Sequence, residues 1–192
     1  MGKIIGFIPA KGISNRLPKK NKIVFLGKPL ISWTLEAAAG SKFLDEIYVS
    51  TEDSEIKDIS LKAGVRVIDR PLDLCQNDVG KQQVLEHALP RIEKECGSLD
   101  KNDIICMLQA NSPEITSNKI DEAIGKVVFN REVFECISMN KYTLFTDGAI
   151  RVFKKHCLNN IGLGMYLSVV LTDYTDVHFE SDLNKIEDSL IV

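Results

Sequence analysis

The sequence predicts an α/β fold in which a mostly parallel β-sheet carries helices on both faces. Short β-branched and apolar runs recur along the 192-residue chain, and segments with apolar residues at helical spacing lie between them. This alternation is typical of βαβ units, which place helices on either side of parallel strands. The length suits one domain with a sizeable core. Since no repeat, low-complexity segment or linker divides the chain, we expect residues 1–192 to form a single domain.

Each expected element follows from a local pattern. The predicted strands are short runs rich in β-branched residues, at Lys3–Ile8, Glu46–Ser50, Val65–Ile68, Ile104–Leu108, Phe134–Ser138 and Ala149–Phe153. The predicted helices space apolar residues along one face, at Leu30–Ala38, Ile56–Ala63, Val84–Ile92 and Ile120–Val127. A last helix is expected at Asp182–Ile191, with Ser181 as its N-cap.

Composition narrows the class of protein. Hydrophobic residues make up 44% of the chain and charged residues 27%, both ordinary for a soluble globular protein. The net charge of −3 does not suit a nucleic-acid binder. No apolar stretch approaches the ~18–20 residues that span a bilayer, and the N-terminus lacks the apolar region of a signal peptide. We therefore expect a cytoplasmic protein with no nucleic-acid or membrane partner.

The cysteines fit the same setting. There are five of them, an odd number, and none forms a CxxC pair. We interpret them as reduced thiols of a cytosolic protein that serve as small, partly buried hydrophobic residues.

A basic loop follows the first predicted strand, in the stretch "IPAKGISNRLPKKN" at residues 8–21. In open α/β sheets, ligands bind at the carboxyl ends of the strands, where this loop lies. Backbone N–H groups near Gly12, the Ser14 hydroxyl and the lysine and arginine charges could together wrap phosphates. Neither GxxxxGK[ST] nor GxGxxG is present. The alternative is a solvated basic turn that pairs with nearby acidic residues.

Several stretches resemble the acylneuraminate cytidylyltransferases (CMP-sialic acid synthetases), and "SNRLPKK" also resembles the 3-deoxy-manno-octulosonate (KDO) cytidylyltransferases. In family order they are "IPAKGISNRLPKKN…LGKPLISWTLEAA", "FLDEIYVSTEDSEI", "GVRVIDRPLDL", "VLEHAL", "LQANSPE", "DGAIRVF" and "DVHFESDL". The resemblance implies a Rossmann-like nucleotide-diphospho-sugar transferase fold. It also implies transfer of CMP from CTP to an acidic sugar, a nonulosonate or KDO-like acid, with release of pyrophosphate and with Mg²⁺.

The resemblance gives roles to the basic loop. It implies that Lys11, where the family usually has arginine, acts as a point charge on phosphate. Ser14 would donate to phosphate, and Asn21 would contact the nucleotide. Arg16 and Lys20 would draw charge from the β- and γ-phosphates as pyrophosphate leaves.

Further nucleotide- and substrate-binding residues carry over from other stretches. Arg70 would lie by the base or ribose; the alternative is a surface arginine before a turn proline. Asp78 resembles the aspartate before the "VLEHAL" helix. Gln109 is implied as a sugar or ribose contact. Asn111 and Ser112 stand where Thr-Ser is commoner, and Ser112 is expected at the site.

The resemblance also implies a metal site just before the final helix, where the family has Asp-x-Asp. Here the two positions hold Asp176 and His178, which would face one side if the segment were a strand. Histidine is a poor ligand for Mg²⁺ and a better one for Mn²⁺ or Co²⁺. Either the metal preference has shifted, or His178 binds substrate while Asp176 holds Mg²⁺ with water, or the site is inactive.

The stretch Lys141–Thr146 is shorter than the family's insertion, which serves dimerisation and the acceptor's carboxylate. We therefore expect a monomer or weak homodimer whose partners are CTP and a small acidic acceptor. Several functions stay open: a cytidylyltransferase for a nonulosonate or KDO-like sugar, one for a smaller acid such as a phosphonate, a transferase using UTP or GTP, and an inactive nucleotide-binding module.

Overall fold

The computed structural model of the chain describes residues 2–158 and 166–190. Its main sheet has seven strands in the order β5-β4-β1-β6-β8-β7-β9. The strands are β1 (Ile4–Pro9), β4 (Glu46–Thr51), β5 (Arg66–Asp69), β6 (Ile104–Leu108), β7 (Glu135–Asn140), β8 (Thr146–Lys154) and β9 (Leu167–Thr172). All neighbours run parallel except β8, which is antiparallel to β6 and β7. The mostly parallel α/β sheet is therefore confirmed.

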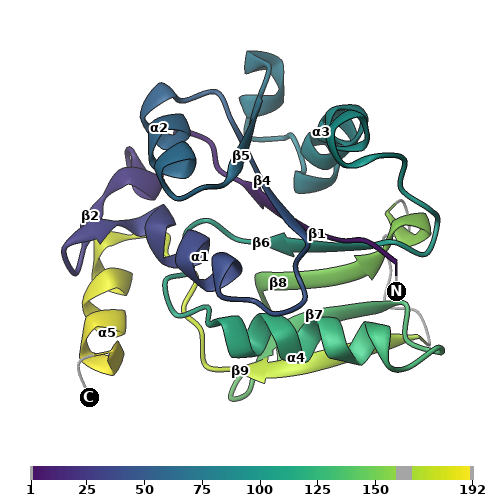
Figure 1. Cartoon of the computed structure of the whole chain (residues 1–192). Coiled ribbons are helices and arrows are strands. Elements are labelled where there is room, and N and C mark those ends of the chain that lie inside the picture. The colour runs from purple at the N-terminus through teal and green to yellow at the C-terminus, as the bar shows by residue number, and fades with distance from the viewer. Residues whose placement is uncertain (1, 159–165, 191–192) are drawn as a thin grey trace.

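Helices cover both faces of this sheet, as Figure 1 shows. The helices are α1 (Leu30–Ala39), α2 (Ser54–Lys62), α3 (Lys81–Cys96), α4 (Ser117–Val128) and α5 (Glu180–Leu190). Strand β1 alternates between two cores, because Ile4 and Ile8 pack with α1, α2 and α4 while Ile5 and Phe7 pack with α3. This period of two is the consequence of burying a strand on both faces.

All six predicted strands are present, but β9 and two short strands, Val24–Phe25 and Lys28–Pro29, were missed. Leu167–Thr172 has the β-branched composition of a strand and pairs with β7 at the edge of the sheet. No helix pattern precedes this strand in the sequence to mark a new βαβ unit. Strand β9 matters for the site because it positions the segment that leads to α5.

The predicted start of the last helix was wrong. The helix begins at Glu180, so Ser181 lies within it and is not its N-cap. Asp182 takes the capping role, because its Oδ2 accepts the backbone N–H groups of His178 and Phe179, each at 2.9 Å. A carboxylate reaching back in this way satisfies two N–H groups that precede the first helical turn. The predicted end, Ile191, lies outside the described residues.

Helix α5 packs beside a short hairpin of β2 (Val24–Phe25) and β3 (Lys28–Pro29), where Figure 1 shows it. The shared apolar cluster joins Phe25 and Leu30 to Val177, Leu183 and Ile186. Helix α5 is thereby fixed against the segment that follows the basic loop.

Two further expectations can be compared with the structure. No helix within residues 2–158 and 166–190 has the length and apolar character to cross a bilayer. The cysteines are all free, and Cys106, Cys136 and Cys157 are buried, as expected for thiols that serve as small hydrophobic residues.

Candidate active site

A cleft of about 190 Å³ opens where β1 and β6 end. Its lining residues come from the basic loop and the end of β1, from the segment between β5 and α3, from the start of α3, and from the residues after β6. They are Pro9, Lys11, Ser14, Lys20, Asn21, Arg70, Leu74, Gln76, Val79, Lys81, Val84 and Asn111. Leu74, Val79 and Val84 make part of the wall apolar, while the basic loop brings cations. Such a combination suits a ligand with an apolar ring and a charged tail.

Five of the predicted residues lie together in this cleft, namely Lys11, Ser14, Lys20, Asn21 and Arg70. Arg16 is exposed and does not line the cleft, although its charge acts on Lys20. Asp78 is exposed and also lies outside the lining. The backbone between η2 (Leu72–Cys75) and α3 turns its side chain to solvent, so the structure gives Asp78 no contact with the site.

The basic loop is fixed to the start of α2. The Gly12 N–H donates to Glu52 Oε1 at 2.7 Å. A Cβ at Gly12 would lie 2.3 Å from Asp53 Oδ2, so no larger residue fits without movement. Lys22 pairs with the same Asp53 oxygen at 2.8 Å. The loop therefore depends on glycine for its close approach to α2.

Asp53 both caps α2 and holds the loop. Its Oδ1 accepts the N–H groups of Glu55 and Ile56, each at 3.0 Å. Partial burial opposes ionisation, but the Lys22 hydrogen bond and the two N–H groups outweigh it, so the pKa of Asp53 lies below its ordinary value.

Asn21 ties the basic loop to itself. Its Nδ2 donates to the Lys11 carbonyl at 2.9 Å, and the residue is only 6% exposed. Its Oδ1 is buried with no partner among the described residues. A buried acceptor without a donor is costly, and here it lies in a cleft wall. It is therefore a candidate contact for a ligand that carries a donor.

Lys20 has a neutral partner only. Its Nζ donates to the Val177 carbonyl at 2.8 Å, and the ion pairs found in the described ranges do not include it. Burial lowers the pKa of Lys20, and the charge of Asp176 opposes that shift. Three neighbouring cations also lower the pKa of Lys20, namely Lys81, Arg16 and Lys11. This gathering of positive charge favours an anionic ligand.

Lys11 and Arg70 bound the cleft on the side of β5. Lys11 Nζ donates to Asn77 Oδ1 at 3.1 Å, which bridges the basic loop to the segment before α3. Arg70 is 7% exposed, and its Nη2 donates to the Ser50 carbonyl at 2.6 Å. The alternative of a surface arginine before a turn proline is therefore wrong. Burial lowers the pKa of Arg70.

Asp176 is the centre of a polar network beside the cleft. Its Oδ1 accepts Gln109 Nε2 at 2.5 Å and Asn111 Nδ2 at 2.8 Å. Its Oδ2 lies 2.9 Å from His178 Nε2. The segment is a loop between β9 and α5, so the expectation of alternating strand positions was wrong, yet the two side chains do meet. Asn111 Nδ2 also donates to the Val177 carbonyl at 3.0 Å and thereby holds the loop in place.

The network offers two protein groups to a metal ion. Within residues 2–158 and 166–190, no three His, Cys, Asp or Glu side chains gather in a way that could hold one. The Asp176–His178 pair therefore needs ligand oxygens or water to complete a coordination shell. Ser112, which was expected at the site, is buried, with only 1% of its surface exposed. Its Oγ has no hydrogen-bond partner among the described residues.

Sequence reasoning missed two residues of the site. Asn111 stood in a quoted stretch but was not given a role. Lys81 begins α3, lines the cleft, and donates from Nζ to Gln109 Oε1 at 2.8 Å. A lysine in the first turn opposes the helix dipole, and that conflict was a signal in the sequence.

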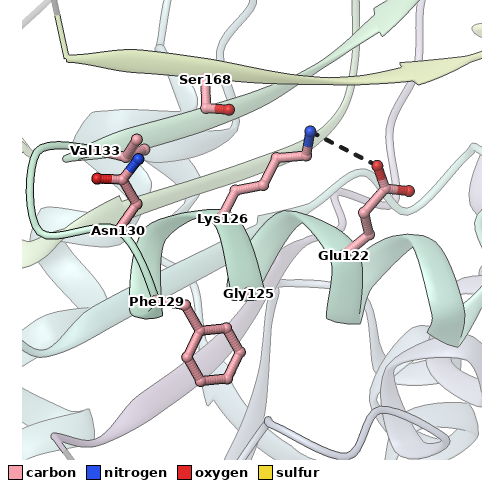
Figure 2. A pocket seen from close by; sticks show the side chains of 7 residues that line it. All are labelled: Glu122, Gly125, Lys126, Phe129, Asn130, Val133 and Ser168. Atoms are coloured by element: carbon pink, nitrogen blue, oxygen red, sulfur yellow. Dashed lines mark ion pairs between the residues drawn. The ribbon is translucent and has the colours of Figure 1, made fainter.

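A second hollow, of about 370 Å³, lies on α4 and is shown in Figure 2. Its lining includes the exposed Phe129, and its one cation, Lys126, already pairs with Glu122 at 3.8 Å. It is larger than the cleft but offers no unmatched positive charge. The chemistry of the residues therefore favours the smaller cleft as the site.

Comparison with solved structures supports the fold. CMP:2-keto-3-deoxy-manno-octonic acid synthetase, solved in complex with CTP, matches with a TM-score of 0.77 over 98% of both chains. The two sequences are 15% identical, so the likeness shows the fold.

Comparison with curated proteins gives closer sequence relatives. The pseudaminic acid cytidylyltransferase of Campylobacter jejuni is 33% identical over 133 residues, which are 69% of this chain and 56% of the relative. The N-acylneuraminate cytidylyltransferase of Escherichia coli is 29% identical over 135 residues, 70% of this chain and 30% of the relative. The chain thus matches about half or less of the length of these relatives. A family described as Cytidylyltransferase matches residues 5–155, most of the described sheet and its basic loop. The chain therefore belongs to the cytidylyltransferase family.

Proposed function

We propose that the chain is a CTP-dependent cytidylyltransferase that moves CMP from CTP to an acidic sugar of the nonulosonate or KDO type. The observation that carries the proposal is the cleft, where Lys20 has no carboxylate partner and shares the Val177 carbonyl with Asn111 of the Asp176 network. Family membership supports the chemistry, and the relatives' names supply the class of acceptor.

The apolar wall and Asn21 would hold the nucleoside. Leu74, Val79 and Val84 offer contact for a base. The buried Asn21 Oδ1 needs a hydrogen-bond donor, which an ionised phosphate cannot supply. A ribose hydroxyl or the amino group of cytosine can. Arg70, fixed on Ser50, borders the same part of the cleft.

The basic loop would hold the triphosphate. Lys11, Ser14 and Lys20 line the cleft, and Arg16 adds charge from its exposed side. In the reaction, the acceptor's hydroxyl oxygen bonds to the α-phosphorus while the bond to the bridging oxygen of pyrophosphate breaks. Lys20 would stabilise the charge that grows on the leaving pyrophosphate.

Asp176 and His178 fit a divalent cation that is shared with substrate. Magnesium in nucleotide enzymes is commonly held by one or two carboxylates and by phosphate oxygens, and a bound ion would screen the phosphate charges. The imidazole of His178 favours Mn²⁺ or Co²⁺ over Mg²⁺. Gln109 and Asn111 would orient the carboxylate.

A smaller acid, such as a phosphonate, is the second candidate acceptor. Only residues 141–145 connect β7 to β8. A connection this short contributes little wall to an acceptor site.

We place the reaction in the cytoplasm, a proposal that the free cysteines support.

Two measurements test this function. Thermal unfolding with CTP, UTP, GTP and ATP should show the largest stabilisation with CTP, because a ligand that binds only the native state stabilises it. Pyrophosphate release should then appear with CTP, a divalent metal and a nonulosonate, KDO or a small phosphonate. Equal shifts with ATP and CTP would contradict the base assignment. Binding of CTP without pyrophosphate release on any acceptor would favour the inactive nucleotide-binding module.

A further inference from the structure

Lys81 lies where the nucleotide half of the sheet meets the antiparallel strand β8. It is the first residue of α3, and its Nζ donates to Gln109 Oε1 at 2.8 Å and more weakly to the Gly148 carbonyl at 3.4 Å. Gly148 has a φ of +69°, and a Cβ there would lie 3.2 Å from Gln109 Oε1. The glycine lets β8 approach, so that α3, β6 and β8 converge on one ammonium group.

The charge of Lys81 has no matching carboxylate. The ion pairs among the described residues do not include Lys81, and both of its hydrogen-bond partners are neutral. It is open to the solvent of the cleft, yet the surrounding protein lowers its pKa by desolvation, which Asp176 opposes. The dipole of α3 repels the same charge. An anion bound here would offset each of these costs.

The charges around Lys81 indicate that the anion it binds is not the triphosphate. Apart from Asp176, the charges that act most on it are Arg151 and Asp147, both on β8. Arg151 is already paired, through Nε, with Glu135 at 2.5 Å. The basic loop supplies its own cations for the triphosphate. Lys81 is therefore the unmatched cation on the β8 side of the cleft.

The sheet face on that side carries side chains that are partly exposed, Arg151 and Ile137 among them. Arg151 and its cross-strand neighbour Ile137 lie on the face opposite α4. On the edge strand β9 the same face ends at Leu171, which is 49% exposed. An acceptor entering over these strands would meet Lys81 before the α-phosphate.

We propose that Lys81 binds the carboxylate of the acidic acceptor and selects acids over their neutral analogues. The inference rests on the proposed cytidylyl transfer. In 2-keto sugar acids the carboxylate is joined to the carbon whose hydroxyl attacks phosphorus. A cation that holds the carboxylate therefore also places the attacking oxygen next to the Asp176 network.

The test compares Lys81→Met with Lys81→Arg and, on the same helix, with the exposed Lys94→Met as a matched control. Steady-state pyrophosphate release gives kcat and the KM values for CTP and for the acceptor. Each protein is also assayed with an acceptor whose carboxylate is replaced by a carboxamide. Thermal shifts with CTP check that the nucleotide site is intact. Lys81→Gln serves as the neutral variant if Lys81→Met does not fold.

Loss of one charge-assisted contact should raise the acceptor's KM roughly 10- to 100-fold and leave the KM for CTP within about twofold. The wild-type preference for the acid over the carboxamide should disappear in the neutral variants and persist in Lys81→Arg and Lys94→Met. A rise in the KM for CTP instead, a fall in kcat with both KM values unchanged, or no change would overturn the assignment. If the wild-type protein binds CTP but releases no pyrophosphate, the proposed function itself is wrong and this inference falls with it.

Discussion

Lys19 and Lys20 are adjacent in the sequence but have opposite surroundings. Lys20 lines the cleft and donates to Val177, whereas Lys19 is exposed and does not line it. We expect Lys20→Ala to lower kcat by roughly 10²-fold, because the variant loses the preorganised positive charge that stabilises the leaving pyrophosphate. The free energy of unfolding should fall by about 1 kcal/mol, the worth of one hydrogen bond. Pyrophosphate release and urea unfolding measure the two effects.

Lys19→Ala is the control and should keep wild-type turnover. Normal turnover in Lys20→Ala would mean that the basic loop is a solvated turn that takes no part in the reaction.

At this scale, resemblance predicted the residue types of the cleft well but not their contacts. Lys11, Ser14, Lys20, Asn21 and Arg70 do gather. Burial of Arg70 could not be read from "DRP", because it depends on Ser50, which lies 20 residues earlier on the neighbouring strand. Lys81 was missed because its partners, Gln109 and Gly148, lie far along the chain, and the lysine in a first helical turn was the one local signal.

Among the elements, the basic loop depends on its close approach to α2. Gly12→Ala would place a methyl group 2.3 Å from Asp53 Oδ2. The loop must then shift, at a cost of about 1–3 kcal/mol. We expect weaker stabilisation by CTP in thermal unfolding and lower turnover.

The matched substitution is Gly125→Ala in α4, where a Cβ would meet Phe129 at an ordinary 3.6 Å. This variant should gain about 0.5–1 kcal/mol from helix propensity and keep wild-type CTP binding. Similar losses in both variants would show that loop packing is not the cause.

The N-cap of α2 makes stability depend on pH. The pKa of Asp53 is lowered in the folded protein from its ordinary value near 3.8. Its ionised form therefore stabilises the fold above about pH 4, and that contribution is lost as the pH falls through the lower, folded pKa. Asp53→Asn keeps a capping side chain but loses the charge that pairs with Lys22. Urea unfolding should find the variant less stable at pH 7, and the gap should narrow as the pH falls below the ordinary pKa of 3.8 towards the lower, folded one; a constant gap would contradict the charge effect.

The elements themselves were largely predictable, because buried strands and one-sided helices leave strong periodic patterns. The exceptions are the short β2–β3 hairpin, which was not predicted, and two features nearer the C-terminus. Strand β9 belongs to no βαβ unit, and α5 is capped by Asp182 from inside the helix rather than by Ser181. Both depend on how distant segments pack.

For the whole molecule, we expect a monomer or weak homodimer. The β7–β8 connection is short, but its tip exposes Tyr142 and Phe145 at 78% and 76%. A patch this small falls well below the roughly 2,000 Å² of an obligate interface. Light scattering should give the mass of one chain at micromolar concentration, with weak association at higher concentration that Phe145→Asp removes. A tight dimer at micromolar concentration would contradict this.

Lys20 and the Val177 carbonyl that holds it are 157 residues apart, and Phe25 packs with Ile186. A ribosome therefore makes the basic loop well before it makes the carbonyl that holds Lys20. A nascent chain that has reached only residue 170 still lacks Asp176, His178 and the Val177 carbonyl that holds Lys20. Pulse-labelled chains should acquire CTP binding only after residues 176–186 emerge, so the basic loop must wait for a distant segment before the site is complete.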